Sequence, residues 1–261
     1  MKNIRLHIAY HGADFHGWQR QPDCSTVEGE IRKAIEQLLD TEEYSFQGAS
    51  RTDAGVHAKG QVANLKHATN RTVWDFVRGL NAMTPKAIRI NHAEEIDLDF
   101  NARHHSAGKR YRYRIFRHRF PDPLQGHLQW EVKGRLDVEA MQVAGHFLVG
   151  EHDFSAFRAS DCQARTTQRE INKVNIITNE AYLEIVVQGN AFLKNMVRII
   201  AGTLVEVGLG QKEAAAIPKI LLSKTRAKAG RTAPARGLLL DEIFYPDYPW
   251  KNEPSLYSRH K

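Results

Sequence analysis

The chain has 261 residues, of which 42% are hydrophobic and 9% aromatic. This is enough apolar material for one large domain or two smaller ones, which excludes an intrinsically disordered protein. The formal net charge of +7 favours a polyanionic partner, such as nucleic acid, an anionic membrane or a phosphorylated substrate. Composition alone leaves a second interpretation open, a basic enzyme without such a partner.

Cysteine usage and hydropathy indicate the compartment. The two cysteines, Cys24 and Cys162, are far apart and lack the CxxC spacing. A core of this size needs no disulfide, so we expect two reduced thiols, as in the cytosol. The N-terminal residues show no apolar signal segment, and no stretch approaches the roughly 18 apolar residues that a membrane helix needs. We therefore expect a cytoplasmic protein that makes no contact with a membrane.

The first 105 residues alternate between predicted strands and helices. Apolar residues at every second position from Ile4 to Tyr10 predict a strand with one buried face. Ser25 and Glu28 have the spacing of a capping box and predict the start of a helix, which apolar residues continue to Leu38. The other predicted elements are strands at 44–49 and 61–65, a helix at 72–82 and a strand at 87–95.

The chain changes character after Asn101. Seven Lys or Arg residues and no acid lie between Arg103 and Arg119, with aromatic residues interleaved. Predicted elements then follow as a helix at 138–148, strands at 170–177 and 182–188, a long apolar helix at 191–207, a shorter helix after Lys212 and an apolar stretch at 237–244. We expect two α+β domains, residues 1–105 and 106–261, with mostly antiparallel sheets and an irregular tail after Tyr245.

The segment from Arg51 to His57 lies between two predicted strands. It has no metal-ligand spacing, no nucleophilic Ser or Cys with a partner and no phosphate-binding glycine pattern. It does place one carboxylate, Asp53, on a tight turn, where catalytic groups often sit. Local chemistry favours a plainer interpretation, in which Asp53 forms an Asx-type turn and Gly55 adopts a positive φ.

The run from Arg51 to Ala58 resembles the Arg-Thr-Asp-Ala-Gly-Val-His-Ala motif of the TruA family of tRNA pseudouridine synthases, and all eight residues match. Ser50 stands where the family often has glycine. Further matching segments occur in order at 10–12, 15–21, 26–29, 100–103, 110–113, 150–158, 189–193, 196–198 and 232–238. The resemblance implies the pseudouridine synthase fold, with two related domains side by side, helices on the outer face and an active-site cleft between the domains.

Pseudouridine formation breaks the N1–C1′ bond of uridine, turns the uracil and rejoins it through C5. A carboxylate can drive this reaction without a cofactor, through attack on the ribose, attack on the base or proton abstraction. The resemblance assigns this role to Asp53. It also implies that Arg198 pairs with Asp53 and that Tyr111 lies against the flipped base.

The residue patterns leave alternatives for each of these side chains. A cation would keep a carboxylate ionised in a closed pocket, but Arg198 could also extend to solvent from the edge of an apolar helix. Tyr111 and Tyr113 share one face of a strand and could both be core residues, with Tyr113 the expected core member. We expect His57 to be a hydrogen-bonded structural histidine rather than an acid or base.

One segment departs from the family pattern. His104 and His105 stand where an aromatic residue and a serine are common. No metal site is expected from these histidines, because no further ligand lies at a suitable spacing. Metal and cofactor are both expected to be absent.

Two acid-free basic tracts, one from Arg103 to Arg119 and one between Ala214 and Leu240, favour an RNA substrate. Spread Lys and Arg residues with interleaved aromatics suit a phosphate-binding groove. A solvated charged face is the alternative. The candidate RNA contacts are Arg51, Arg103, Arg110, Tyr111, Arg112, Lys224, Arg226, Lys228 and Arg231. The resemblance implies a homodimer that modifies uridines 38, 39 and 40 of the tRNA anticodon stem-loop.

Two other hypotheses remain from the residues. The first is an RNA-binding module without chemistry, in which Asp53 only shapes a turn. The second is a nuclease that uses Asp53 and His57, although the motif lacks a second acidic ligand for a metal ion.

Overall fold

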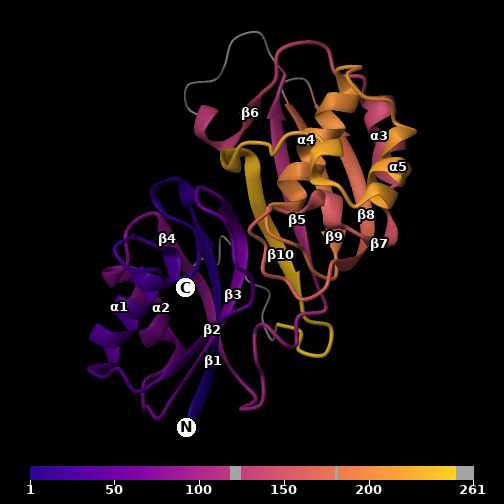
Figure 1. The fold of residues 1–261 in the computed structure, drawn as a ribbon. Coiled ribbons are helices and arrows are strands. Elements are labelled where there is room, and N and C mark those ends of the chain that lie inside the picture. The colour runs from indigo at the N-terminus through magenta and orange to yellow at the C-terminus, as the bar shows by residue number, and fades with distance from the viewer. Residues whose placement is uncertain (118–124, 180–181, 251–261) are drawn as a thin grey trace. The chain divides into compact units, whose positions relative to one another are not determined.

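A computed structural model describes residues 1–117, 125–179 and 182–250. Residues 118 and 119 of the first basic tract and most of the predicted tail lie outside these ranges. The chain divides into two compact units, which Figure 1 shows. Unit 1 contains Met1–Ala107 and the residues from Leu240 onward, and unit 2 contains Gly108–Leu239.

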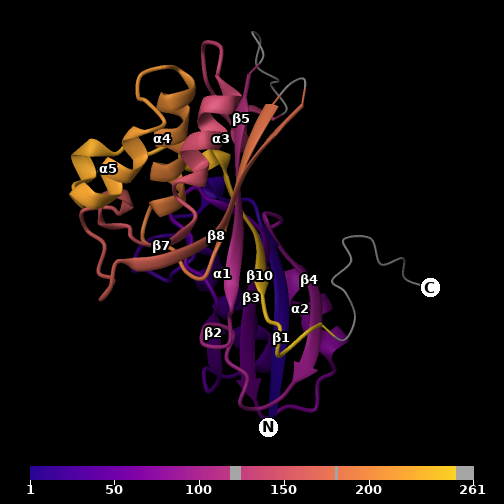
Figure 2. The same ribbon diagram turned by 90° about the vertical axis from the view of Figure 1, so that its right-hand side faces the viewer.

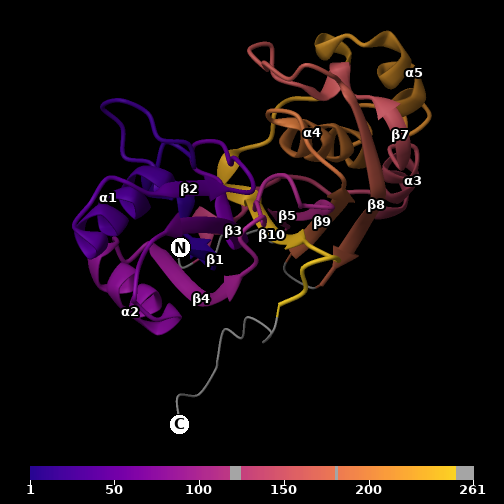
Figure 3. The same cartoon turned by 90° about the horizontal axis from the view of Figure 1, so that it is seen from below.

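Unit 1 is a mostly antiparallel sheet with two helices on one face (Figure 3). The strand order is β4-β1-β3-β10, and β2 pairs with β3. The strands are β1 (Lys2–Tyr10), β2 (Ser45–Gly48), β3 (His57–His67), β4 (Ile88–Ile96) and β10 (Leu238–Phe244). The helices are α1 (Val27–Leu39) and α2 (Val73–Met83). Ile4, Leu6 and Ile8 are buried along β1, which confirms the predicted strand. The single buried face was wrong, because Asn3 and Arg5 on the other face are also buried.

β10 accounts for the difference between the two units and the predicted domains. The sequence places everything after residue 105 in the second domain, whereas residues 240–250 group with unit 1. β10 lies next to β3, where a Cβ at Gly60 would come 2.3 Å from the carbonyl oxygen of Asp241. An apolar pattern does not specify which sheet a terminal strand joins, so the sequence could not show this.

Helix α1 begins one residue later than its predicted capping box. Thr26 is the N-cap, and its side chain accepts from the N–H of Gly29. The predicted pair, Ser25 and Glu28, does not form the box. The carboxylate of Glu28 instead accepts from the N–H of Arg20 and from Arg32. Adjacent Ser and Thr residues are both good caps, so only the geometry decides between them.

Unit 2 repeats the same layered arrangement, with three helices on one face of a sheet (Figure 2). The strand order is β5-β9-β8-β7, and β6 pairs with β5 in parallel. The strands are β5 (Gly108–Phe116), β6 (Trp130–Glu131), β7 (Gly150–Asp153), β8 (Gln168–Thr178) and β9 (Tyr182–Gly189). The helices are α3 (Val138–His146), α4 (Met196–Gly208) and α5 (Ala216–Ser223). The predicted α+β class with mostly antiparallel strands is confirmed.

Helix α4 is shorter than predicted. The apolar pattern extends back to Ala191, but Asn195 adopts a left-handed conformation with φ 62°. A residue in this region cannot continue a right-handed helix, so α4 begins at Met196. Within the described ranges, no helix has the length and apolar character needed to span a bilayer.

The sheet face of unit 1 opposite the helices carries a buried arginine. Arg5 is fully buried on β1, and its guanidinium pairs with Glu94 of β4. It also donates to the carbonyl oxygens of Tyr248 (2.6 Å) and Pro249 (3.1 Å), and lies 3.8 Å from the centre of the Trp250 ring. Arg5 therefore holds the segment after β10 against the sheet.

Replacing Arg5 with methionine leaves Glu94 buried without its cation. We expect the free energy of unfolding to fall by about 3–5 kcal/mol in urea titrations. Lys2→Met on the same strand is the matched control, because Lys2 and Glu95 are 3.5 Å apart and partly exposed (30% and 53%). That control should lose less than about 1 kcal/mol. Equal losses in the two variants would contradict this assignment.

His7 lies on the same face as Arg5 and meets the Trp250 ring edge-on, with 5.8 Å between ring centres. Burial, and then the neighbouring His92 and Lys59, lower the pKa of His7 from 6.5 to about 4. Between these values the unfolded chain binds a proton that the folded chain does not. His7 therefore stabilises the fold fully only above pH 6.5, and the contribution is lost as the pH falls towards 4.

We expect wild type to lose roughly 1–3 kcal/mol more than His7→Gln when the pH falls from about 7 to about 4. Urea titrations of the two proteins at several pH values measure the difference. A constant difference across this range would show that His7 does not titrate abnormally in the fold.

Candidate active site

Asp53 lies in the loop that joins β2 to β3. The N–H of Val56 donates to the carbonyl oxygen of Asp53 (3.1 Å), and Gly55 has φ +78°. These features confirm a tight turn with a positive φ at Gly55, closed by the main chain of Asp53, while the Asx-type bond of its side chain stays a prediction. Asp53 is partly exposed. Of its neighbours in the loop, Arg51 is exposed, whereas Thr52 and Val56 are buried. The turn therefore holds the carboxylate at the surface of a rigid backbone.

The segment from Tyr10 to Trp18 fastens this loop. The N–H of Trp18 donates to the carbonyl oxygen of Thr52 (3.1 Å). The N–H of Gly55 donates to the carbonyl oxygen of Phe15 (3.2 Å). The hydroxyls of Tyr10 and Thr52 are also hydrogen-bonded, at 2.8 Å. The backbone is thus held on both sides of Asp53.

Two glycines allow this contact. A Cβ at Gly12 would lie 2.0 Å from the carbonyl oxygen of Val56. Gly17 has φ +89°, and a Cβ there would lie 2.6 Å from the carbonyl oxygen of Thr52. Both positions touch backbone, which has little freedom to yield. Only glycine fits in these places, which gives a structural reason for the two glycines of the N-terminal segment.

His57 supports the loop from the first residue of β3. The residue is only 4% exposed, and its Nδ1 accepts from the N–H of Gly12 (3.0 Å). An acceptor Nδ1 carries no proton, so the geometry requires the neutral ring. This arrangement agrees with the structural role expected for His57.

In unit 2, Tyr111 and Tyr113 point to the same side of β5 and are both buried. Tyr113 is 0% exposed and donates to the carbonyl oxygen of Pro234 (2.8 Å), which confirms it as a core residue. Tyr111 is 6% exposed and meets the Phe192 ring edge-on, with 5.2 Å between ring centres. Phe192 was not among the predicted site residues, although it belongs to one of the family-like segments.

Arg198 lies in the first turn of α4 and is held by neutral groups of unit 2. Its Nε donates to the carbonyl oxygen of Ala233 (2.8 Å), and Nη1 donates to Oδ1 of Asn195 (2.8 Å). The N–H of Ala233 donates back to the carbonyl oxygen of Arg198 (3.1 Å). The side chain is half-buried and oriented, unlike an arginine that extends freely to solvent.

The predicted RNA contacts differ in how far they are engaged within the chain. Arg112 pairs with Glu184 of β9 (3.2 Å), and Lys224 pairs with Asp153 (3.0 Å). Arg226 donates to Gly230 and Thr232. Arg110 is half-buried, and the exposed members are Arg51, Arg103, Lys224, Lys228 and Arg231. Arg112 and Glu184 are 72 residues apart in the sequence and meet only because β5 and β9 pair in the sheet. The sequence alone could not show this ion pair.

Asp153 was not predicted as a functional residue, although it belongs to the family-like segment 150–158. Burial works against its ionisation, yet hydrogen bonds from Ser155, Thr167 and Lys224 hold the pKa of the carboxyl below its usual range. The ionised carboxylate therefore anchors Lys224. The Asp-Phe-Ser run at 153–155 was the only feature of the sequence that could have pointed to Asp153.

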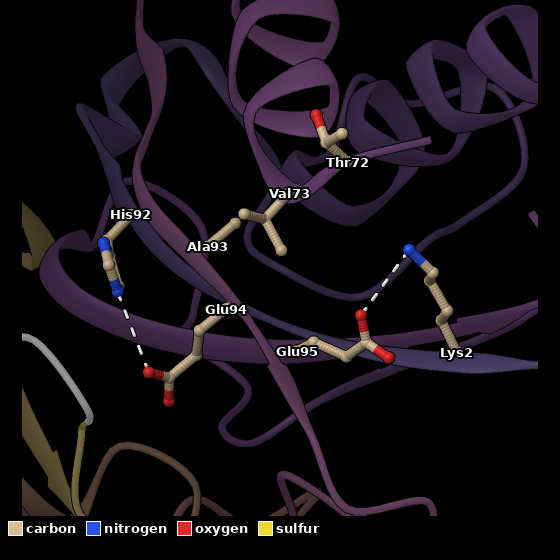
Figure 4. Close-up of a pocket in the computed structure, with 7 residues that line it drawn as sticks. All are labelled: Lys2, Thr72, Val73, His92, Ala93, Glu94 and Glu95. Carbon is tan, nitrogen blue, oxygen red and sulfur yellow. Dashed lines mark ion pairs between the residues drawn. The ribbon is translucent and has the colours of Figure 1, made fainter. Parts of the chain in front are cut away.

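A pocket of about 390 Å³ lies beside β4 and the start of α2 (Figure 4). In it, Lys2 points towards Glu95 and His92 towards Glu94. No predicted site residue lines this pocket, and its charges are already paired, so we assign no function to it. In the described ranges, no three His, Cys, Asp or Glu side chains gather as metal ligands would.

Residues 7–105 and 144–246 match the profile of a tRNA pseudouridine synthase family, which covers more than half of the chain. The chain belongs to this family. The tRNA pseudouridine synthase A of Acetivibrio thermocellus is 46% identical over 245 residues, 94% of this chain and 100% of the relative. The tRNA pseudouridine synthase A of Myxococcus xanthus is 44% identical over 250 residues, 95% of this chain and 94% of the relative.

Among solved structures, the archaeal box H/ACA sRNP Nop10–Cbf5 complex is similar over 77% of this chain and 44% of that chain. The identity is 12% and the TM-score is 0.34. At this level the likeness does not bear on the fold, which follows from the strands and helices of the chain itself.

The contact at Gly17 predicts a specific loss of activity. Gly17→Ala pushes a Cβ into the backbone beside Asp53, so we expect pseudouridine formation to slow by about tenfold to a hundredfold. Gly210→Ala is the matched control, because Gly210 also has a positive φ (+71°) but has nothing within 4 Å of its Cβ. Gly210→Ala should lose about 1 kcal/mol of stability because of its positive φ, and Gly17→Ala should lose more, because its Cβ also meets backbone. Equal turnover in the two would exclude the steric effect.

Proposed function

We propose that this protein converts uridines 38, 39 and 40 of the tRNA anticodon stem-loop to pseudouridine, with Asp53 as the reactive group. Membership of the tRNA pseudouridine synthase family makes it an isomerase that acts on uridine in tRNA. The observation that supports Asp53 is its loop, which is hydrogen-bonded on both sides to the segment from Tyr10 to Trp18. A carboxylate fixed in this way is pre-oriented for reaction.

The reaction needs no cofactor in this proposal. The N1–C1′ bond of uridine breaks, the uracil turns and C5 bonds to C1′; C5 then loses its hydrogen as a proton and N1 gains a proton. Asp53 acts by attack on the ribose or the base, or by removal of a ribose proton, and none of these routes calls for a cofactor. The ionised form is the one required, so a cation near the carboxylate favours activity.

We further propose that Arg198 supplies this cation and that Tyr111 packs against the flipped uracil. A guanidinium has five N–H donors, of which the bonds to Ala233 and Asn195 use two, and its planar fork matches a carboxylate. Tyr111 is buried against Phe192, and an aromatic wall of this kind suits a flat base. All three side chains then act on the same uridine.

The anionic partner in this proposal is tRNA. The proposed phosphate contacts are Arg51, Arg103, Arg110, Arg112, Lys224, Lys228 and Arg231. Their charges suit a phosphate backbone, and the net charge of +7 agrees with this partner. We also propose that the protein acts as a homodimer in the cytoplasm. Arg226 is not among these phosphate contacts, because its guanidinium bonds Gly230 and Thr232 within the chain.

Asp53→Asn tests the central assignment. The amide keeps the size of the side chain but is neither a nucleophile nor a base, so we expect pseudouridine formation to fall by more than about a thousandfold. Release of tritium from tRNA that carries 5-tritiated uridine measures the reaction. Asp40→Asn is the control, because Asp40 is exposed at the left-handed end of α1 and asparagine tolerates this conformation.

Full activity of Asp53→Asn would refute the role of Asp53. Binding of tRNA that survives in both proteins, with no pseudouridine from wild type, would favour an RNA-binding module without chemistry. Strand scission of tRNA on a gel would favour the nuclease. Mapping pseudouridine in tRNA from cells with and without the protein tests the three positions.

A further inference from the structure

The orientation of Arg198 depends on one carbonyl group in the segment before β10. Its Nε–H bonds to the carbonyl oxygen of Ala233 (2.8 Å), and this bond fixes the plane of the guanidinium. The other N–H donors of Arg198 then point in directions set by that plane. Whatever holds Ala233 in place therefore also orients Arg198.

The segment that contains Ala233 lies directly against helix α4. A Cβ at Gly202 would come 1.9 Å from the carbonyl oxygen of Arg231, and a Cβ at Gly230 would come 2.6 Å from the Cα of Thr203. Glycines on both sides of the contact thus bring backbone against backbone. Such a contact leaves little freedom for the segment to slide along the helix.

Polar bonds fix the segment at successive points. The N–H of Gly230 donates to Oγ1 of Thr203 (2.9 Å), and the N–H of Arg231 donates to Oε1 of Glu206 (2.9 Å). At the other end, the hydroxyl of Tyr113 donates to the carbonyl oxygen of Pro234 (2.8 Å). Ala233 lies between these anchored residues.

Arg226 closes the loop that leads into this segment. Its Nη1 donates to the carbonyl oxygen of Gly230 (2.8 Å), and its Nη2 donates to Oγ1 of Thr232 (3.0 Å). The two acceptors flank Arg231, so a single guanidinium spans the turn. The side chain is partly buried, whereas Lys228 in the same basic tract is exposed.

We propose that Arg226 is a positioning residue for Arg198, and that its place in a basic tract does not reflect contact with RNA. Its planar, forked guanidinium holds Gly230 and Thr232 at a fixed spacing, which sets the carbonyl of Ala233 and so the direction of Arg198. Lysine cannot replace it, because an ammonium group has no such fork. This inference rests on the proposed role of Arg198 in the reaction.

The experiment separates positioning from RNA contact by keeping the charge and removing the fork. Arg226→Lys and Arg226→Met are compared with wild type and with Lys228→Met. The measurements are the single-turnover rate of pseudouridine formation, the Kd for tRNA at several salt concentrations and the thermal midpoint of unfolding. Thr232→Val removes only one of the two acceptors and is the milder variant if the Arg226 variants fail to fold.

Both Arg226 variants should lower the single-turnover rate by about tenfold or more. They should change the Kd by less than about twofold and leave its salt dependence unaltered. Lys228→Met should show the opposite pattern, with weaker binding and a salt slope reduced by about one. In an Arg198→Lys background, Arg226→Lys should cause little further loss, because both changes disturb the same group.

A normal rate for Arg226→Lys would overturn the proposal, as would a weakened Kd with a reduced salt slope in Arg226→Met. Additive losses in the double variant would also overturn it. Failure of the proposed function is distinguishable, because wild type itself would then form no pseudouridine. Normal activity of Arg198→Lys would refute the role of Arg198 while leaving Asp53 untouched.

Discussion

The backbone contact between residues 11–18 and the loop before β3 decides where Asp53 lies. Hydrogen bonds from this segment hold Thr52 and Gly55, the residues that flank the turn. The contact requires glycine at 12 and 17, because any Cβ would strike a carbonyl oxygen. His57 joins the same network through the N–H of Gly12. Two sequence segments some forty residues apart therefore form a single unit, and neither fixes the carboxylate alone.

Unit 2 uses the same physical device for Arg198. Its guanidinium bonds a main-chain carbonyl at Ala233, and glycines at 202 and 230 allow that chain segment to lie against α4. Main-chain groups have less freedom than long side chains, so they make better supports for a reactive group. As a consequence, these glycines tolerate no substitution without a shift of the chain, because any Cβ would collide with backbone.

The sequence predicted the α+β class and most elements, because alternation and helical spacing directly reflect burial. It misplaced the starts of α1 and α4, where Thr26 and the left-handed Asn195 decide the boundary. It could not assign β10 to a sheet, nor pair Arg112 with Glu184, since such contacts depend on how distant segments meet. Asp53 emerged only from the family resemblance. Local chemistry indicated only a turn at Asp53. The two interpretations are compatible, because the turn carries the carboxylate that we propose as the reactive group.

Unit 1 is discontinuous in sequence, because the whole of unit 2 is inserted between its parts. Arg5 bonds the carbonyl of Tyr248, 243 residues further along the chain. During synthesis Arg5 can pair with Glu94 of β4 well before Tyr248 exists. The face of the sheet that carries Arg5 nevertheless stays open to water until the last segment arrives. Contacts of such high sequence separation slow folding. The N-terminal part of the chain thus depends on the C-terminal part to complete its core, and a chain cut short before β10 would expose that unfinished surface to aggregation.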